Sequence, residues 1–299
     1  MAGFRLDRAA SLLVYGFLRK NDRRRRRVPI LMYHDISDPG EASGNPYYHT
    51  STTVEAFTAQ MDYLHRAGYR VTGLDDLVGG RMPPEKKSVV ITFDDGLRTF
   101  FTRAFPVLDR YGFTATVFLV TGCVEEQGWF QQQRCLTWKE VRDLGNSGIS
   151  FGSHTVSHPM LRVLDKNRLA HEVTQSRRMI EERTGRVVRY FSYPFAFPEE
   201  DKRFARSLKE LLLETGYRAC VTTSVGRAEP GTGRFYLGRI PVNSMDDPVL
   251  FRAKLEGAYD WMHPLQLLSK KARFTAARVH NLLKRADSTE GQYGRLETR

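Results

Sequence analysis

The sequence predicts an α/β protein in which about seven or eight parallel strands close into a distorted barrel. Two observations lead to this prediction. Short apolar segments alternate with helical segments between residues 29 and 242, as expected of repeated βαβ units. The chain also has 299 residues, which suits one barrel domain with additional segments at both ends.

The predicted strands are short, apolar and bounded by turn residues. The segment that leads into Phe93 shows the pattern well, because it runs through Val89, Val90 and Ile91 without a charge, as a buried strand does. We expect strands at residues 29–33, 69–72, 88–93, 115–120, 149–152, 188–193, 219–222 and 239–242.

The predicted helices lie between these strands, and glycine follows most of them closely. We expect helices at residues 54–66, 99–111, 137–147, 165–184 and 202–214. Thr137 and Glu140 have the spacing of a capping box at the start of the third helix. The catalytic domain is therefore assigned to residues 28–245, between an N-terminal extension, 1–27, and a helical C-terminal extension, 246–299, which we expect to fray at its end.

The two extensions carry much of the excess positive charge. The chain has 46 Lys and Arg against 34 Asp and Glu, a formal charge of +12. Five consecutive arginines occupy residues 23–27, and six basic residues follow a helical pattern between residues 270 and 285. Such segments attract the phosphates of nucleic acid or of anionic lipid, or are simply solvated. No reader motif accompanies them, so no specific nucleic acid partner is expected.

The apolar run near the N-terminus bears on the expected location. Ala9 to Leu18 is about half the roughly 20 residues that span a bilayer, and no small-residue cleavage site precedes the arginines. We expect a cytoplasmic protein, peripheral to the inner face of the membrane if residues 4–18 form an amphipathic helix with Arg5, Arg8 and Arg19 at the headgroups. Three irregularly spaced cysteines fit a reducing compartment.

Reactive side chains follow several predicted strands directly, where α/β barrels place catalytic groups. His34 follows residues 29–33, Asp94 and Asp95 follow 88–93, and His154 follows 149–152, with His158 four positions later. This spacing brings the two imidazoles to one side of a helical turn or tight loop. Two imidazoles and a carboxylate form a three-ligand site for zinc or a similar ion, with a position left for water.

The adjacent carboxylates Asp94 and Asp95 have two interpretations. On their own they would indicate only a turn that caps the next helix. Together with His154 and His158, they suggest that one carboxylate binds a metal ion while the other takes a proton from water. The chain turns at a strand end, so neighbouring side chains can point in different directions.

These residues resemble the motifs of the NodB-type polysaccharide deacetylases, carbohydrate esterase family 4. The family's TFDDG motif is present at residues 92–96, and its H-S/T-x-x-H-P motif at residues 154–159. The resemblance implies a distorted (β/α)7-8 barrel of NodB type, here with basic helical N- and C-terminal extensions. It also implies that Asp94 is the general base and that Asp95, His154 and His158 hold the metal, usually Zn2+, or another divalent transition metal such as Co2+ or Ni2+.

Two family motifs depart from their usual form. The F-R-x-P-Y-G motif appears as FSYPFA at residues 191–196, without its arginine, and Arg239 is the expected replacement. We assign Phe195, Tyr193 and Arg239 to oxyanion or substrate binding. The backbone N–H of Phe195 can donate to the oxyanion, because a change of side chain leaves it in place. The L-x-x-H-D motif is missing late in the chain, but residues 30–35 have the same form. This resembles the circularly permuted subgroup and makes His34 the general acid rather than a residue that merely caps a strand.

The resemblance implies a metal-dependent hydrolase that removes N-acetyl groups from amino sugars. Its carbohydrate partner would be a polysaccharide or a lipid-linked precursor, in exopolysaccharide biosynthesis, with a peripheral membrane contact. Two alternatives remain open: a deformylase of a lipid-linked formamido sugar, and a catalytically inactive sugar-binding module.

Overall fold

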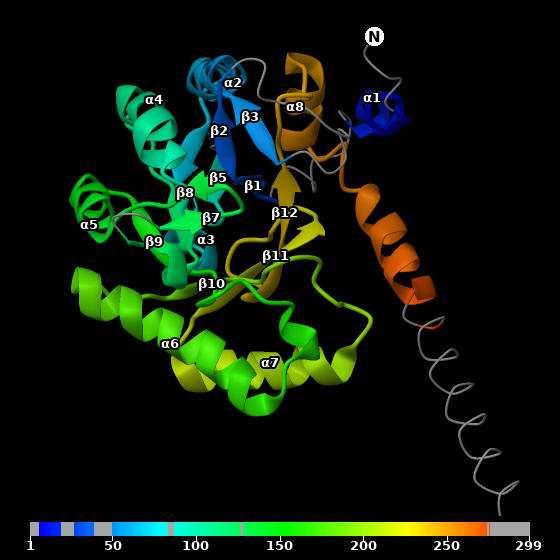
Figure 1. Cartoon of the computed structure of the whole chain (residues 1–299). Helices are drawn as coiled ribbons and strands as arrows, with labels where there is room; N and C mark the ends of the chain where they lie inside the picture. Colours follow the sequence, from blue (N-terminus) through cyan, green and yellow to red (C-terminus); the bar gives the residue numbers. More distant parts are fainter. Residues whose placement is uncertain are drawn as a thin grey trace, which may run out of the picture.

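The computed structural model describes residues 6–18, 27–38, 50–82, 87–125, 128–273 and 275. Seven parallel strands form a closed ring at its centre (Figure 1). Their order around the ring is β1 (Ile30–Tyr33), β12 (Phe235–Pro241), β11 (Ala219–Val225), β10 (Tyr190–Ser192), β9 (Ser150–Ser153), β6 (Thr116–Leu119) and β5 (Ser88–Phe93). Pairing of β1 with β5 closes the ring, and β4 (Arg70–Thr72) adds to β5 as an eighth strand. The predicted barrel of seven or eight parallel strands is confirmed.

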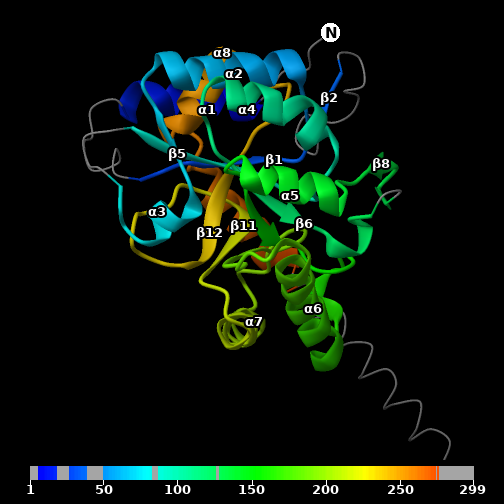
Figure 2. The ribbon, with the colours of Figure 1, turned by 90° about the vertical axis from the view of Figure 1, so that its left-hand side faces the viewer.

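The helices pack around the outside of this ring (Figures 1 and 2). They are α2 (Val54–Arg66), α3 (Leu74–Val78), α4 (Phe105–Arg110), α5 (Trp138–Asn146), α6 (Lys166–Thr184) and α7 (Lys202–Thr215). Both hydrogen bonds of the expected capping box form, because Thr137 accepts from the Glu140 N–H and the Glu140 side chain accepts from the Thr137 N–H. The helix expected at residues 99–111 begins instead with a π-helical turn, Phe100–Ala104.

Two small sheets were not expected from the sequence. β2 (Asp35–Ser37) pairs with β3 (Ser51–Thr53), and β7 (Trp129–Phe130) forms a hairpin with β8 (Gln133–Arg134). Strands of two or three residues are too short to show a hydrophobic period, so the sequence pattern does not reveal them.

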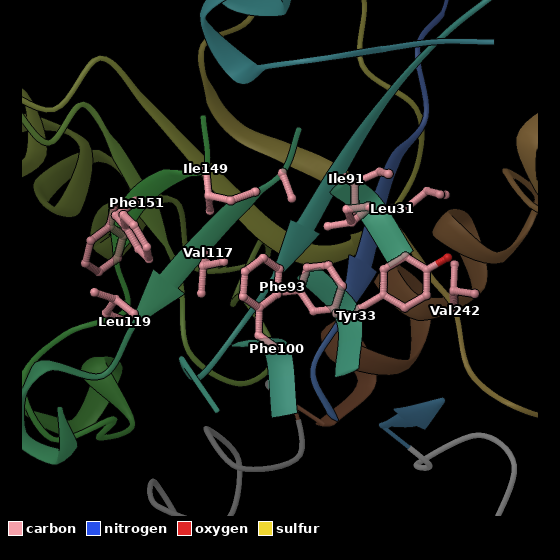
Figure 3. Close-up of a cluster of buried hydrophobic side chains, with 14 of the residues drawn as sticks. Leu31, Tyr33, Ile91, Phe93, Phe100, Val117, Leu119, Ile149, Phe151 and Val242 are labelled. Atoms are coloured by element: carbon pink, nitrogen blue, oxygen red, sulfur yellow. The ribbon is translucent and has the colours of Figure 1, made fainter. Parts of the chain in front are cut away.

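Along each strand, side chains point alternately into the barrel and outward toward the surrounding helices. Along β5, Val89, Ile91 and Phe93 join the large cluster beneath the helices, which Figure 3 shows in part. Val90 joins a separate cluster that takes members from six of the seven ring strands, from α3 and from two residues outside the strands. Residues from around a closed ring can meet only inside it. The side chains of Val90, Thr92 and Asp94 therefore share the interior side, because residues two apart lie on one face of a strand.

The terminal segments form a helical layer on one side of the barrel (Figure 1). This layer consists of α1 (Leu6–Leu18), α8 (Pro248–Leu255) and a helix over residues 262–273, and α1 packs against α8. Among the described residues, every helix is too short or too polar to cross a bilayer. Most of the expected arginine run, Arg5, Arg19 and residues 276–299 lie outside the described residues.

Candidate active site

Asp94 and Arg239 form a buried ion pair at the C-terminal end of the barrel. Arg239 donates from Nη1 to Asp94 Oδ1 at 2.7 Å and from Nη2 to Asp94 Oδ2 at 2.6 Å. Its Nε donates to the Thr222 carbonyl at 2.9 Å, and Ser192 Oγ donates to Asp94 Oδ1 at 3.1 Å. The Arg239 and Asp94 side chains are only 0% and 1% exposed. The expected arginine is therefore in contact with the expected base, but it is too deeply buried to touch a substrate.

His34 lies near the same carboxylate. Its Nε2 is 3.9 Å from Asp94 Oδ2, and its side chain is 19% exposed. His34 follows Ile30 and Met32 at two-residue steps along and just beyond β1, and Ile30 belongs to the interior cluster. The same alternation that places Asp94 thus turns His34 toward the mouth of the barrel.

Asp95, His154 and His158 come together as the sequence predicts. One ligand atom from each lies within 4.8 Å of the others. Asp95 Oδ1 is 3.5 Å from His154 Nε2 and 3.7 Å from His158 Nε2. This buried oxygen has no hydrogen-bond partner within the protein. Buried carboxylate oxygens are normally paired, so an oxygen that faces two imidazole nitrogens fits a divalent metal ion.

The tautomer of His154 supports the same interpretation. Its Nδ1 lies 2.8 Å from the Ser192 carbonyl, which can only accept a hydrogen bond. Nδ1 therefore carries the proton, and Nε2 presents its lone pair toward Asp95. This outer hydrogen bond is the usual way in which a protein orients a metal-binding histidine.

Burial sets the charge state of the site. It raises the pKa of Asp95 to about 6 and lowers the pKa of His154 to about 3. Burial likewise lowers the pKa of His158, so both imidazoles are neutral at neutral pH, as metal ligands must be. Burial would also raise the pKa of Asp94, but the Arg239 guanidinium outweighs it and holds that pKa well below its usual value. Asp94 therefore remains ionised.

Backbone strain is concentrated at this site. Asp95, Thr155, His158 and Phe195 have φ values of 71°, 70°, 55° and 59°, and they are four of the seven non-glycine residues with positive φ in the described chain. A left-handed backbone is unfavourable for side chains with a Cβ and persists where the surroundings enforce it. The turn at Asp95 directs its side chain away from that of Asp94. Gly96 completes this turn, and a Cβ there would lie 2.7 Å from Leu119.

The sequence suggested that Phe195 and Tyr193 both bind the substrate or its oxyanion, but only Phe195 lies at the edge of the site. The Phe195 ring is 46% exposed and lies 4.5 Å from the His158 ring, at the edge of the site. Tyr193 is 1% exposed and packs edge-on against Phe197, at a ring separation of 5.1 Å. The assignment of Tyr193 to substrate binding is thus wrong for its side chain, because Tyr193 shares the outward face of β10 with Phe191.

Two supporting residues were missed by the sequence analysis. Ser192 holds both Asp94 and His154, and Glu172 organises the histidine loop by accepting from the Val156 and Ser157 N–H groups at 2.8 and 2.9 Å. The alternation of β10 would have revealed Ser192, which lies opposite Phe191 and Tyr193. Glu172 gives no comparable signal, because a glutamate on a polar helix is ordinary.

The closed parallel barrel thus carries at one end a carboxylate and two histidines that could hold a metal ion, beside a second, buried carboxylate. Residues 81–219 match the family model for polysaccharide deacetylase. YxkH of Bacillus subtilis, which is named for the same family, is 30% identical over 234 residues, covering 77% of this chain and 76% of that protein. The chain belongs to the polysaccharide deacetylase family.

Two further relatives bear on the chemistry. The poly-beta-1,6-N-acetyl-D-glucosamine N-deacetylase of Staphylococcus aureus is 25% identical over 206 residues, covering 64% of this chain and 68% of that enzyme. The structure of the Streptococcus pyogenes deacetylase PplD in complex with acetate superposes with a TM-score of 0.65 at 26% identity, covering 77% of this chain and 98% of that one.

Proposed function

We propose that the protein is a metal-dependent hydrolase that removes N-acetyl groups from amino-sugar residues. One observation carries the proposal. A buried, ionised carboxylate, Asp94, lies next to a cluster of three metal-binding groups and 3.9 Å from a partly exposed imidazole, His34. Amide hydrolysis needs such a set: a base for water, a charge-stabilising centre and an acid for the leaving amine.

Asp95, His154 and His158 would hold the metal ion. Zinc suits two neutral imidazoles and one carboxylate, and cobalt or nickel can use the same ligands. When bound, the ion would lower the pKa of water and polarise the substrate carbonyl.

Asp94 acts as the general base. It accepts a proton from the attacking water, and its ion pair with Arg239 keeps it oriented and ionised before each turnover. Arg239 is thus a positioning residue rather than a substrate ligand, since its side chain is 0% exposed.

His34 acts as the general acid. Its side chain is 19% exposed at the mouth of the barrel, so it can reach a bound substrate. It donates a proton to the amino-sugar nitrogen as the C–N bond breaks, which lets the sugar leave as an amine and the acetyl group as acetate. The backbone N–H of Phe195 would donate to the developing oxyanion.

The substrate is an amino sugar in a polymer or in its lipid-linked precursor. The staphylococcal relative is named for a poly-N-acetylglucosamine substrate, which supports the polymeric choice. Phe195 and Trp129, 46% and 57% exposed, offer flat surfaces for sugar rings near the site. Phe130, next to Trp129, lies 5.1 Å from the His158 ring and so ties this hairpin to the site.

Two other functions fit parts of the site. A deformylase of a lipid-linked formamido sugar would use the same residues, since the acyl group differs only by a methyl. An inactive sugar-binding module is disfavoured by the presence of base, metal ligands and acid together.

The protein works in the cytoplasm, in contact with the inner face of the membrane. Free, buried Cys123, Cys135 and Cys220 support a reducing compartment. The basic residues that follow α1 in the sequence support contact with an anionic lipid surface, which is typical of the cytoplasmic leaflet.

Acyl release from a panel of sugars tests this function. N-acetyl and N-formyl sugars, free and lipid-linked, would be incubated with zinc-loaded protein and analysed by mass spectrometry. We expect acetate release from N-acetylglucosamine oligomers and little release by Asp94→Asn, which should still bind zinc. Release of formate alone would establish the deformylase. Zinc binding with no release from any sugar would support the binding module.

A further inference from the structure

Helix α1 is attached to the barrel domain through its polar side. Asp7 is 3% exposed and accepts a hydrogen bond from the Tyr259 hydroxyl at 3.0 Å. Ser11, one turn later, is 0% exposed and accepts from Trp261 Nε1 at 3.0 Å. Arg8 on the same helix contacts Asp247, the N-cap of α8. Residues four apart share one side of a helix, so these polar contacts define the side that faces the domain.

The opposite side of α1 is apolar and exposed. Leu6 and Leu13 are 69% and 72% exposed, and they lie seven residues apart on the same side of the helix. A helix at the surface of a globular protein normally buries its leucines and exposes its polar residues. In α1, Leu6 and Leu13 are exposed whereas Asp7 and Ser11 are buried, so one apolar side of the helix is open to a partner.

Further exposed apolar side chains lie in the same helical layer. Twelve large hydrophobic residues of the described chain are exposed, and five of them belong to this layer: Leu6, Leu13, Val249, Leu265 and Leu268. The bond from Trp261 to Ser11 places the start of helix 262–273 beside α1. Three short helices thus carry five of the twelve, while the other seven are distributed over the rest of the described chain.

The charges next to these leucines favour an anionic partner. Lys271 and Arg273 are exposed and follow Leu268 within two turns of the helix. In the sequence, Arg19, Lys20 and the five arginines of residues 23–27 follow α1 directly. Apolar side chains flanked by Lys and Arg are typical of helices that lie in the headgroup region of anionic bilayers.

The same layer is fastened to the active-site rim. Glu199, four residues after Phe195, accepts from Lys270 Nζ at 2.9 Å and lies 2.8 Å from His263 Nε2. Gln266, on the same side of the helix, accepts from the Val225 N–H at 2.9 Å. Any surface that binds this layer is thus held at a fixed distance from the site.

We infer that the outward side of α1 and the exposed leucines of helix 262–273 form a docking surface for an anionic lipid bilayer. The leucines enter the headgroup region, and Lys271 and Arg273, together with the basic residues that follow α1 in the sequence, bind lipid phosphates. Docking then holds the mouth of the barrel over the membrane, which suits a substrate carried on a lipid. This inference rests on the membrane contact in the proposed function and is independent of the deacetylase chemistry.

Vesicle flotation of the full chain tests the docking surface. Vesicles of phosphatidylglycerol with phosphatidylcholine would be compared with vesicles of phosphatidylcholine alone. The test variant is Leu6→Gln with Leu13→Gln, since glutamine keeps a good helix propensity. The matched control is Val187→Gln with Leu213→Gln, two side chains that are 60% and 52% exposed elsewhere on the barrel.

We expect the wild-type chain and the control to float with anionic vesicles at low salt and to be released at high salt. The test variant should bind at least about tenfold more weakly, because two apolar anchors are lost. Equal binding by the test variant, or no binding by wild type, would overturn the inference. So would a wild-type dimer that the test variant converts to a monomer in light scattering, because a second copy would then cover the leucines.

Activity on a free amino-sugar oligomer separates this inference from the deacetylase proposal. The test variant should hydrolyse the free oligomer as wild type does and lose rate only on a lipid-linked substrate in vesicles. If the wild-type chain floats with vesicles but hydrolyses no substrate, the docking surface is supported and the proposed deacetylase activity is contradicted.

Discussion

Arg239 and Asp94 pair through two parallel hydrogen bonds inside the barrel, although 145 positions separate them in the sequence. Ser192 of the FSYPFA segment bonds to both partners, since its hydroxyl donates to Asp94 and accepts from Arg239. The buried network around Asp94 therefore joins Arg239 on β12 to Ser192 on β10, two strands away in the ring.

Removing the Arg239 guanidinium should lower the free energy of unfolding and raise the pKa of Asp94. In Arg239→Met, Asp94 would keep its burial without a cation, which costs about 3 to 5 kcal/mol of unfolding free energy and raises the pKa of Asp94. Urea unfolding and kcat/KM would measure both effects. Arg178→Met is the control, since its pair with Glu182 lies in solvent. Unchanged stability in Arg239→Met would show that the pair is not formed.

Replacing His34 should reveal whether it protonates the leaving group. We expect His34→Gln to lower kcat on an N-acetyl sugar by about 10²- to 10⁴-fold. An aryl acetate has a leaving group that needs no proton, so the same variant should hydrolyse it at close to the wild-type rate. The comparison of the two substrates is the measurement, and equal losses on both would point to a role in binding or folding.

Zinc affinity should fall in mild acid because of Asp95. Burial raises the pKa of this carboxyl to about 6, so the metal must displace a proton below that pH. His154, with a pKa lowered to about 3, does not compete in this range. We expect the dissociation constant, measured by competition with a chelating dye, to rise about tenfold per pH unit below about pH 6. Asp95→Asn should bind weakly with a shallower dependence, and a flat wild-type profile would contradict the assignment.

Glu199 should couple the C-terminal helix to the Phe195 loop. Burial would raise its pKa, but hydrogen bonds from Ser224, His263 and Lys270 lower it to about 2. Because the pKa is lowered on folding, this stabilisation is present above the usual carboxyl pKa and is lost as the pH falls toward 2.

The Glu199→Ala variant tests this coupling at neutral pH. It should expose helix 262–273 to limited proteolysis and lower kcat, whereas Glu256→Ala, which removes the Arg252 pair at the C-terminal end of α8, should do neither. Faster cleavage with unchanged kcat would show that Glu199 anchors the helix without affecting the active site.

Much of this protein could be predicted from local sequence patterns. The strands leading to His34, Asp94 and His154 are continuous apolar runs or short segments bounded by turns, and parallel strands in a barrel bring such ends to one mouth. The four-residue spacing of His154 and His158 and the Asp94–Asp95 doublet then predicted the cluster of Asp95, His154 and His158 that could hold a metal ion. These inferences succeed because they depend on contacts within a segment or on the shared direction of the strands.

The tertiary structure alone decided which side chains meet across the ring and which side of a helix is covered. Strand order brings Arg239 to Asp94, and the face of β10 buries Tyr193 while it directs Ser192 inward. Helix α1 is amphipathic in sequence, yet its polar side binds the domain because Tyr259 and Trp261 present partners there. Local sequence sets period and capping, whereas pairing between distant segments depends on how the whole ring closes.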